Sequence, residues 1–186
     1  MNEDDAIKNN MEKIIHTLEK ESFDKGDKLE RVLDALIPLS REIKKRDIED
    51  KITEDFRRRF SRLASEDSNR IGLYLYLARC SNYAELGRLN GFRVACEMRS
   101  AFEVFTDEFM VWSESQREDF HGLYIEEIED IDETLKDVSD EAIPIREKDI
   151  PAWVPESHWW WRSPAQQDMS EEEIRQHLEY VHWGGF

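Results

Sequence analysis

The chain has 186 residues, of which 37% are charged and 39% hydrophobic, and this composition fits one domain with a sizeable buried core. Gly and Pro are scarce, with seven and five residues, which argues against an all-β fold with many tight turns. The net charge is −17, from 43 acidic and 26 basic residues, and such a chain repels nucleic acids and anionic membranes at long range and attracts basic partners.

Three features predict a cytoplasmic protein with reduced thiols. Only two cysteines occur, Cys80 and Cys96, which is too few for a secreted disulfide scaffold. The first ten residues are acidic and lack the apolar stretch of a signal peptide. The longest apolar run, residues 71–78, is far shorter than the roughly 18 residues of a membrane span, so we expect no membrane partner.

Hydrophobic residues recur at helical spacing from the start of the chain. A first helix is predicted over residues 4–22, and the polar stretch 24–27 separates it from a second helix. Pro38 is expected to end or kink the second helix. Ser40 is expected to cap a third helix that runs to about Ala64.

The fourth and fifth predicted helices form the centre of the expected bundle. Ser68 is a plausible N-cap for the fourth helix, which is apolar on most sides at its start. A strand over residues 71–77 is the alternative, because short apolar runs are ambiguous. Asn90 and Gly91 are expected to stop this helix, and the fifth helix then runs over residues 92–112. We expect the two to pack as an antiparallel hairpin.

A sixth helix and an irregular arm complete the expected fold. Ser115 and Glu118 fit a capping box at the start of the sixth helix. After Ser139 the periodicity disappears, and a segment rich in Pro and Trp follows. Ser170 and Glu173 predict a second capping box, which begins a short last helix. The residues flanking that box, Met169 and Ile174, are placed as in a hydrophobic staple.

The predicted fold class is therefore all-α. We expect a compact bundle of six or seven helices, with an irregular Trp/Pro-rich C-terminal arm and a short last helix. The bundle is assigned to residues 1–139, and the arm and short helix, packed on the same domain, to residues 140–186.

The sharpest chemical feature is the acidic sixth helix, which has six carboxylates in residues 126–133. If its isoleucines face inward, five acids share the outer face: Glu126, Glu129, Asp130, Glu133 and Asp137. Like charges one turn apart slightly destabilise a helix. Three readings stay open: a solvated face, a docking face for a basic protein, and adventitious binding of divalent cations, for which the spacing of a calcium loop is missing.

Five of the six tryptophans lie in the last 34 residues, and three of them are consecutive. In an extended segment neighbouring side chains alternate, so Trp159 and Trp161 would cover the bundle while Trp160 points away. The arm then seals apolar surface, serves as an aromatic anchor for a partner, or does both. The anchor reading assigns partner contacts to Trp160 and Arg162, because Trp and Arg are enriched at binding hot spots.

Other chemistry is weakly indicated. The basic run between Lys44 and Arg62 is interleaved with acids, so we expect its side chains to be exposed or paired with the acidic helix, and not to bind nucleic acid directly. No nucleophile elbow or phosphate-binding loop occurs. The two cysteines have apolar neighbours and are expected to be inert.

Two sequence matches have the form of a metal-binding motif. Glu118 with His121, and Glu179 with His182, have the spacing used in helical di-iron proteins. The chain is so rich in Glu that matches of this kind arise by chance, and we expect no metal, no cofactor and no catalytic residue.

These observations predict a protein-binding module, not an enzyme, that neutralises a basic partner. The most economical version is an immunity or antitoxin-type inhibitor of a nuclease toxin, because nuclease surfaces that hold phosphate are basic. The alternatives are a DNA mimic that occupies a nucleic-acid-binding protein and a carboxylate-bridged metal enzyme. The oligomeric state is not indicated.

Overall fold

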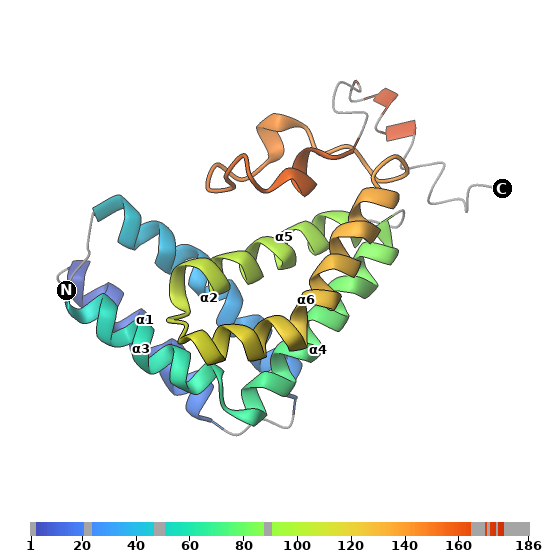
Figure 1. Ribbon diagram of the computed structural model, residues 1–186. Coiled ribbons are helices and arrows are strands. Elements are labelled where there is room, and N and C mark those ends of the chain that lie inside the picture. The colour runs from blue at the N-terminus through green and yellow to red at the C-terminus, as the bar shows by residue number, and fades with distance from the viewer. Residues whose placement is uncertain are drawn as a thin grey trace. The chain divides into compact units, whose positions relative to one another are not determined.

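The computed structural model describes residues 3–20, 24–46, 51–87 and 91–164, and also 170, 172, 173, 175 and 176. The predicted all-α fold is confirmed, since these residues form helices and no strand (Figure 1). None of the described helices combines the length and apolar character needed to cross a membrane. The α-helices are α1 Glu3–Glu19, α2 Lys25–Arg46, α3 Lys51–Ala64, α4 Asp67–Glu85, α5 Gly91–Val104 and α6 Glu114–Asp137.

The helices are distributed over two compact units. The first contains Met1–Leu77 and Ala101–Tyr124, and the second contains Ala78–Ser100 and Ile125–Phe186. Helices α4 and α6 therefore each contribute one half to each unit. The division of the chain after residue 139 stays a prediction.

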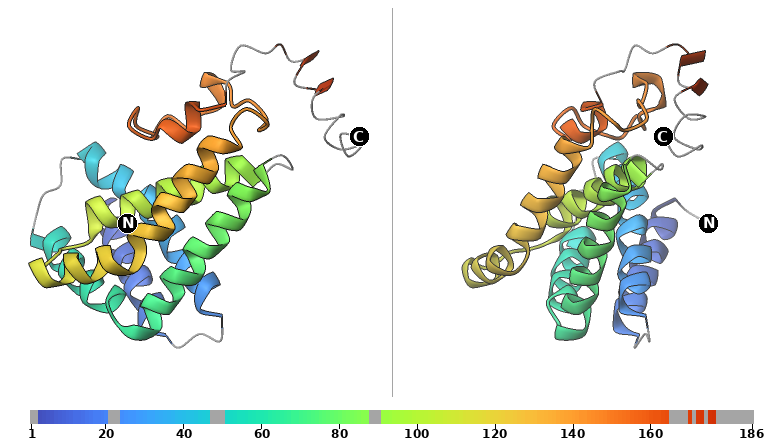
Figure 2. Two further views of the ribbon diagram at one scale, coloured as in Figure 1. Left: turned by 45° about the vertical axis from the view of Figure 1, so that its right-hand side comes forward. Right: turned by 90° about the vertical axis from the view of Figure 1, so that its right-hand side faces the viewer.

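In the first unit, α1 packs against α2 and α3, and α1 and α2 lie side by side in Figures 1 and 2. A cluster of aromatic rings joins α3 to the π-helix η2, Phe105–Phe109, which directly follows α5. Phe60 lies with its ring centroid 5.8 Å from that of Phe105 and 6.2 Å from that of Phe109. Phe60 of α3 is fully buried, whereas Ile52 of the same helix is 39% exposed.

Pro38 does not end the second helix, because α2 continues through it to Arg46, and the other expectation, a kink, stays a prediction. Leu39 and Ile43, which follow the proline, are buried, and their packing offsets the backbone hydrogen bond that proline cannot make. Ser40 is consequently inside α2 and caps no helix. Its hydroxyl instead donates a 2.5 Å hydrogen bond to the Glu108 carboxylate of η2.

The second unit contains the end of α4, all of α5 except its last turn, the second half of α6 and the arm. The end of α4 and α5 lie against each other as the expected hairpin predicts, and the Cys80 thiol is 3.6 Å from the Ala95 carbonyl oxygen. The arm includes two 3-10 helices, η3 Glu147–Asp149 and η4 Trp159–Arg162. Ile145, Ile150 and Val154 of the arm are buried. The arm therefore covers apolar surface, which is one of its two expected roles.

Three boundaries and faces differ from expectation. The start of helix α4, which is apolar on most sides, is not buried on all of them, because Ile71, Tyr74 and Leu75 are 44–51% exposed. Helix α6 begins at Glu114, so the box expected at Ser115 lies inside it. The fifth helix ends earlier than residue 112, since its α-helical part stops at Val104 and continues only as the π-turn.

The second capping box is confirmed. The Ser170 backbone N–H donates to the Glu173 carboxylate at 2.7 Å, and the Glu173 N–H donates to the Ser170 hydroxyl at 3.2 Å. These bonds hold the pKa of Glu173 below its ordinary value, because they stabilise the charged carboxylate. The expected staple, Met169 and Ile174, falls outside the described residues.

Two glycines are expected to respond in opposite ways to alanine. A Cβ at Gly91 would overlap the Tyr83 carbonyl oxygen and crowd that of Leu86, so Gly91→Ala should destabilise the protein by about 2 kcal/mol. A Cβ at Gly122, within α6, would meet nothing within 4 Å, so Gly122→Ala should stabilise it by about 0.5–1 kcal/mol. Urea unfolding of both variants checks the pair, and equal effects would contradict the packing at Gly91.

Candidate functional site

The outer face of α6 carries the expected row of carboxylates. All five predicted acids are exposed: Glu126, Glu129, Asp130, Glu133 and Asp137. Ile131 and Leu135 face the opposite way and are fully buried, which sets the rotation of the helix. The 3.6-residue period then turns the five acids toward solvent.

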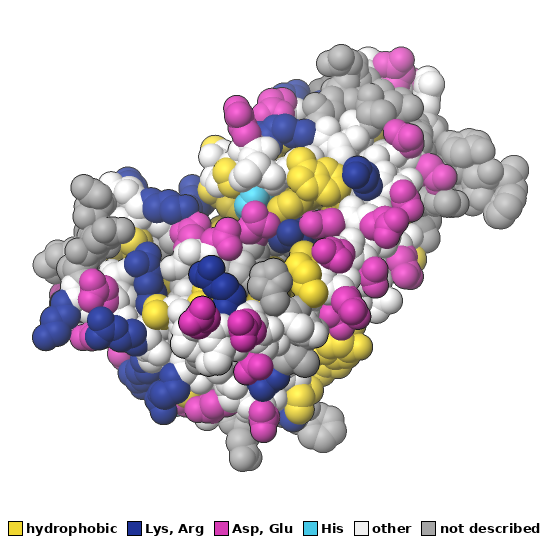
Figure 3. Space-filling view, in the orientation of Figure 1, with side chains coloured by type: hydrophobic (Ala, Val, Ile, Leu, Met, Phe, Trp, Pro, Cys, Tyr) yellow, Lys and Arg dark blue, Asp and Glu magenta, His cyan; other side chains and the backbone are white. Residues whose placement is uncertain are grey.

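These five carboxylates make no ion pair with any residue in the described part of the chain, and the only base nearby in sequence is Lys136, which is also exposed. Figure 3 shows Asp and Glu side chains gathered over the region where Figure 1 places the second half of α6. We call these five residues the acidic face. Because its carboxylates are exposed and make no ion pair with described residues, a basic partner can approach them without displacing an internal cation.

Asp132, in the middle of the same helix, has a different environment. It accepts hydrogen bonds from the Arg99 guanidinium of α5 at 2.8 and 3.2 Å. The Arg99 side chain is 9% exposed and lies over the Trp160 ring, 4.5 Å from its centroid. Asp132 is therefore structural, since it joins α6 to α5 and to the arm.

The consecutive tryptophans belong to the 3-10 helix η4, and two of them meet one serine. The indole N–H groups of Trp160 and Trp161 donate to the Ser100 hydroxyl oxygen at 3.0 and 2.9 Å. The His158 Nδ1 lies 2.9 Å from the same oxygen. Ser100 is fully buried at the end of α5, so this group fastens the arm to that helix.

The donors and acceptors around the Ser100 hydroxyl determine which atom donates in its hydrogen bond with His158. An indole N–H only donates, and a hydroxyl has two acceptor positions and one hydrogen. Because Trp160 and Trp161 occupy both acceptor positions, the hydroxyl hydrogen points to His158 Nδ1, which accepts. Neutral His158 thus carries its proton on Nε2. Both lone pairs of the Ser100 oxygen are occupied by the indole N–H groups, so the hydrogen bond to His158 does not make this hydroxyl a nucleophile.

The expectation that Trp160 points away from the bundle is wrong, because Trp160 is 2% exposed. That expectation assumes an extended segment with alternating side chains. The segment is instead the 3-10 helix η4, which has about three residues per turn and buries Trp160 and Trp161 together. Trp159 is only half-buried. Arg162 is half-buried as well, and its guanidinium lies 3.0 Å from the Glu147 carboxylate. Trp160 therefore offers no surface to a partner.

Lys45, Lys51 and Arg62 of the basic run are exposed, as one of the two expectations had it, while other members pair with acids outside the acidic face. Arg59 of α3 bridges to Glu12 and Glu19 of α1 at 3.2 and 2.8 Å, and these contacts lower the pKa of Glu19. Lys44 of α2 lies 2.7 Å from Glu108. All of these contacts are internal to the first unit. None of the ion pairs among the described residues involves the acidic face, so the alternative expectation, pairing of the basic run with that helix, is not seen there.

The metal motifs find no support in the described residues. Glu118 is exposed, while the side chain of His121 and both Glu179 and His182 are outside the described part of the chain. Among the described His, Cys, Asp and Glu side chains, no group of three or more is placed to hold a metal ion.

Both thiols are buried and held protonated. Burial raises the pKa of Cys80 to about 12 and raises the pKa of Cys96 well above its ordinary value of 9.0. The Cys96 thiol also lies 3.6 Å from the Trp160 carbonyl oxygen, so it is part of the packing under the arm.

The two thiols are expected to be unreactive toward a disulfide reagent at mildly alkaline pH until the protein unfolds. Unfolded cysteine ionises near pH 9, whereas the folded thiols keep their protons above it. The stability they contribute is therefore present below that pH and is lost as pH rises toward 12. Timed thiol titration with and without urea checks this, and rapid labelling of the folded protein would contradict it.

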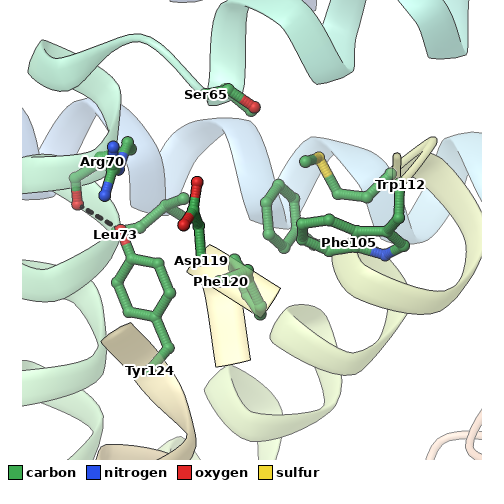
Figure 4. A pocket seen from close by; sticks show the side chains of 10 residues that line it. Ser65, Arg70, Leu73, Phe105, Trp112, Asp119, Phe120 and Tyr124 are labelled. Atoms are coloured by element: carbon green, nitrogen blue, oxygen red, sulfur yellow. Dashed lines mark hydrogen bonds between the residues drawn. The ribbon is translucent and has the colours of Figure 1, made fainter. Parts of the chain in front are cut away.

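The first unit contains a pocket that sequence patterns did not indicate. Its volume is about 180 Å³, and it is lined from α3, α4, η2, the segment after η2, and α6 (Figure 4). Four rings and two opposite charges dominate the lining: Phe105, Trp112, Phe120, Tyr124, Arg70 and Asp119. These residues are far apart in sequence, so no local spacing reveals the pocket.

The chain matches no protein-family model. Searches of curated proteins and of solved structures also find no significant similarity.

Proposed function

We propose that this chain is an acidic protein-binding module that neutralises a basic partner, most economically as an immunity or antitoxin-type inhibitor of a nuclease toxin. The observation that carries the proposal is the acidic face: five exposed carboxylates on one side of α6, without ion pairs to described residues. Such a face steers a basic partner during encounter and covers the surface with which a nuclease holds phosphate.

The packing of α6 supports this role of its carboxylates. Ile131 and Leu135 fix the inner side, and the bidentate pair between Arg99 and Asp132 anchors α6 to α5. The carboxylates therefore project from a rigid backbone, which lowers the entropy lost on binding. Trp160 has no part in the proposed surface, since it is buried, and Arg162 would contribute only after leaving Glu147.

A charge-reversal variant tests the proposal. Replacing Glu126, Glu129, Asp130 and Glu133 with Lys should weaken one-to-one binding to the cognate basic protein by roughly 100-fold at low salt. Binding by the unchanged protein should also weaken as salt increases, because exposed charges are screened. The measurement is a calorimetric titration with a partner captured from the source organism, together with its nuclease activity in the complex.

A matched variant controls for net charge. Asp5, Glu85, Asp140 and Glu156 are exposed and lie outside the acidic face, and replacing all four with Lys changes the net charge equally. This control should keep most of the affinity. Equal losses in both variants would mean non-specific attraction, and unchanged binding after reversal of the acidic face would refute its role. Capture of several unrelated DNA-binding proteins would instead identify a DNA mimic.

A further inference from the structure

The pocket of the first unit has the size of a small-ligand site. A closed apolar cavity of about 150 Å³ is enough to hold a benzene molecule, and this pocket measures about 180 Å³. Aromatic rings extend along it: the Trp112 and Phe120 ring centroids are 4.5 Å apart, and those of Phe120 and Tyr124 are 4.7 Å apart. Together with Phe105 they offer a surface for one apolar group.

Two opposite charges also line the pocket, Arg70 at the end away from Phe105 and Trp112, and Asp119 between the two ends. Figure 4 shows the Asp119 side chain in the middle of the lining, with Arg70 and Tyr124 on one side and Phe105 and Trp112 on the other. Asp119 is exposed, and within the described part of the chain it makes no ion pair, not even with Arg70. The Arg70 guanidinium lies 3.8 Å from the Asp67 carboxylate, and this ion pair is weak because the Asp67 side chain is 98% exposed.

This arrangement of charges selects among ligand classes. A ligand with only an ammonium group would be attracted by Asp119 but repelled by Arg70. A ligand with only a carboxylate would be attracted by Arg70 but repelled by Asp119. A neutral apolar ligand would contact the rings but would pair with neither charge. A ligand with one positive and one negative group satisfies both side chains, while its apolar part lies at the end with Phe105 and Trp112.

The pocket wall is held in place before any ligand arrives. The Tyr124 hydroxyl donates to the Arg70 carbonyl oxygen at 3.0 Å and so joins α6 to α4. The Val111 backbone N–H donates to the Ser61 hydroxyl at 2.7 Å, which ties the segment after η2 to α3. The π-helix η2 itself places Phe105 in the wall.

We propose that this pocket binds a small zwitterion with one apolar group, of the class of a free amino acid with an aromatic or branched side chain. Its ammonium lies at Asp119, its carboxylate at Arg70, and its side chain among Phe105, Trp112 and Phe120. The proposal does not rest on the acidic face, which belongs to the second unit, so either can fail without the other.

Calorimetric titration of the whole chain with L-phenylalanine and L-leucine tests this inference. We expect saturable one-to-one binding of at least one of them at up to millimolar concentrations. Phenethylamine lacks the carboxylate and 3-phenylpropionate lacks the ammonium, and each should bind about tenfold or more weakly than L-phenylalanine. Asp119→Asn and Arg70→Gln should each weaken amino-acid binding by about the same factor.

Glu114→Gln is the matched control, because Glu114 is exposed on the same helix and does not line the pocket. It should bind within about twofold of the unchanged protein. Circular dichroism establishes that each variant is folded. The proposal is overturned if neither amino acid binds, if phenethylamine binds as well as phenylalanine and Arg70→Gln has no effect, or if the control loses affinity equally.

Discussion

Replacing Ser100 with alanine is expected to lower the free energy of unfolding by about 3 kcal/mol, because one hydroxyl serves three buried groups. The substitution leaves the indole N–H groups of Trp160 and Trp161 without an acceptor and removes the hydrogen donated to His158. Each buried polar group without a partner costs about 1–3 kcal/mol. Urea unfolding followed by circular dichroism measures the loss.

Ser157→Ala is the matched control for this prediction. Ser157 lies in the same arm, is exposed, and its side chain has no described hydrogen bond. Its replacement should change the free energy of unfolding by less than about 0.5 kcal/mol. A Ser100→Ala variant as stable as this control would show that the indole groups do not depend on the hydroxyl, and the assignment of Ser100 as the fastening point of the arm would fail.

Replacing Arg99 with alanine is expected to cost about 3 kcal/mol, through two contacts at once. The substitution leaves the Asp132 carboxylate, 29% exposed, without its bidentate partner, and it removes the cation that covers the Trp160 ring. Arg99→Lys should recover only part of the loss, because an ammonium cannot make the two parallel bonds. Urea unfolding of both variants gives the comparison.

Arg93→Ala controls for the loss of an arginine from α5. Arg93 and Glu97 form an exposed pair one turn apart, with side chains 53% and 49% exposed. Such pairs contribute roughly 0.3–0.5 kcal/mol, so the control should remain close to the unchanged protein. If Arg99→Ala and Arg93→Ala lose equal stability, the Arg99 pair is no stronger than a surface contact, and α6 is held by apolar packing alone.

The two variants also test whether the arm is fastened at one point or two. Ser100 and Arg99 are neighbours on α5, and both contact Trp160. If their effects are coupled, the double variant should lose less stability than the sum of the single variants. Additive losses would show that the hydrogen bonds and the cation contact act independently.

The sequence by itself determined features that depend on neighbours a few residues apart. The all-α class follows from hydrophobic spacing, and it is confirmed. The capping box at Ser170 and Glu173 forms as expected, since both partners lie within one helical turn. The exposure of the acidic face was predictable for the same reason: Ile131 and Leu135 set the rotation of α6, and the carboxylates follow from the helical period.

Only the tertiary structure decided where distant segments meet. Pro38 remains inside α2 because Leu39 and Ile43 find buried sites, which outweighs the local preference of proline to end a helix. Trp160 is buried because Ser100, 60 residues away, accepts its indole hydrogen. The pocket between Arg70 and Asp119 likewise draws on several helices. Proline inside a helix costs about 3 kcal/mol, whereas burial of a large apolar side chain contributes about 1.5–3 kcal/mol, so two buried side chains such as Leu39 and Ile43 can offset it.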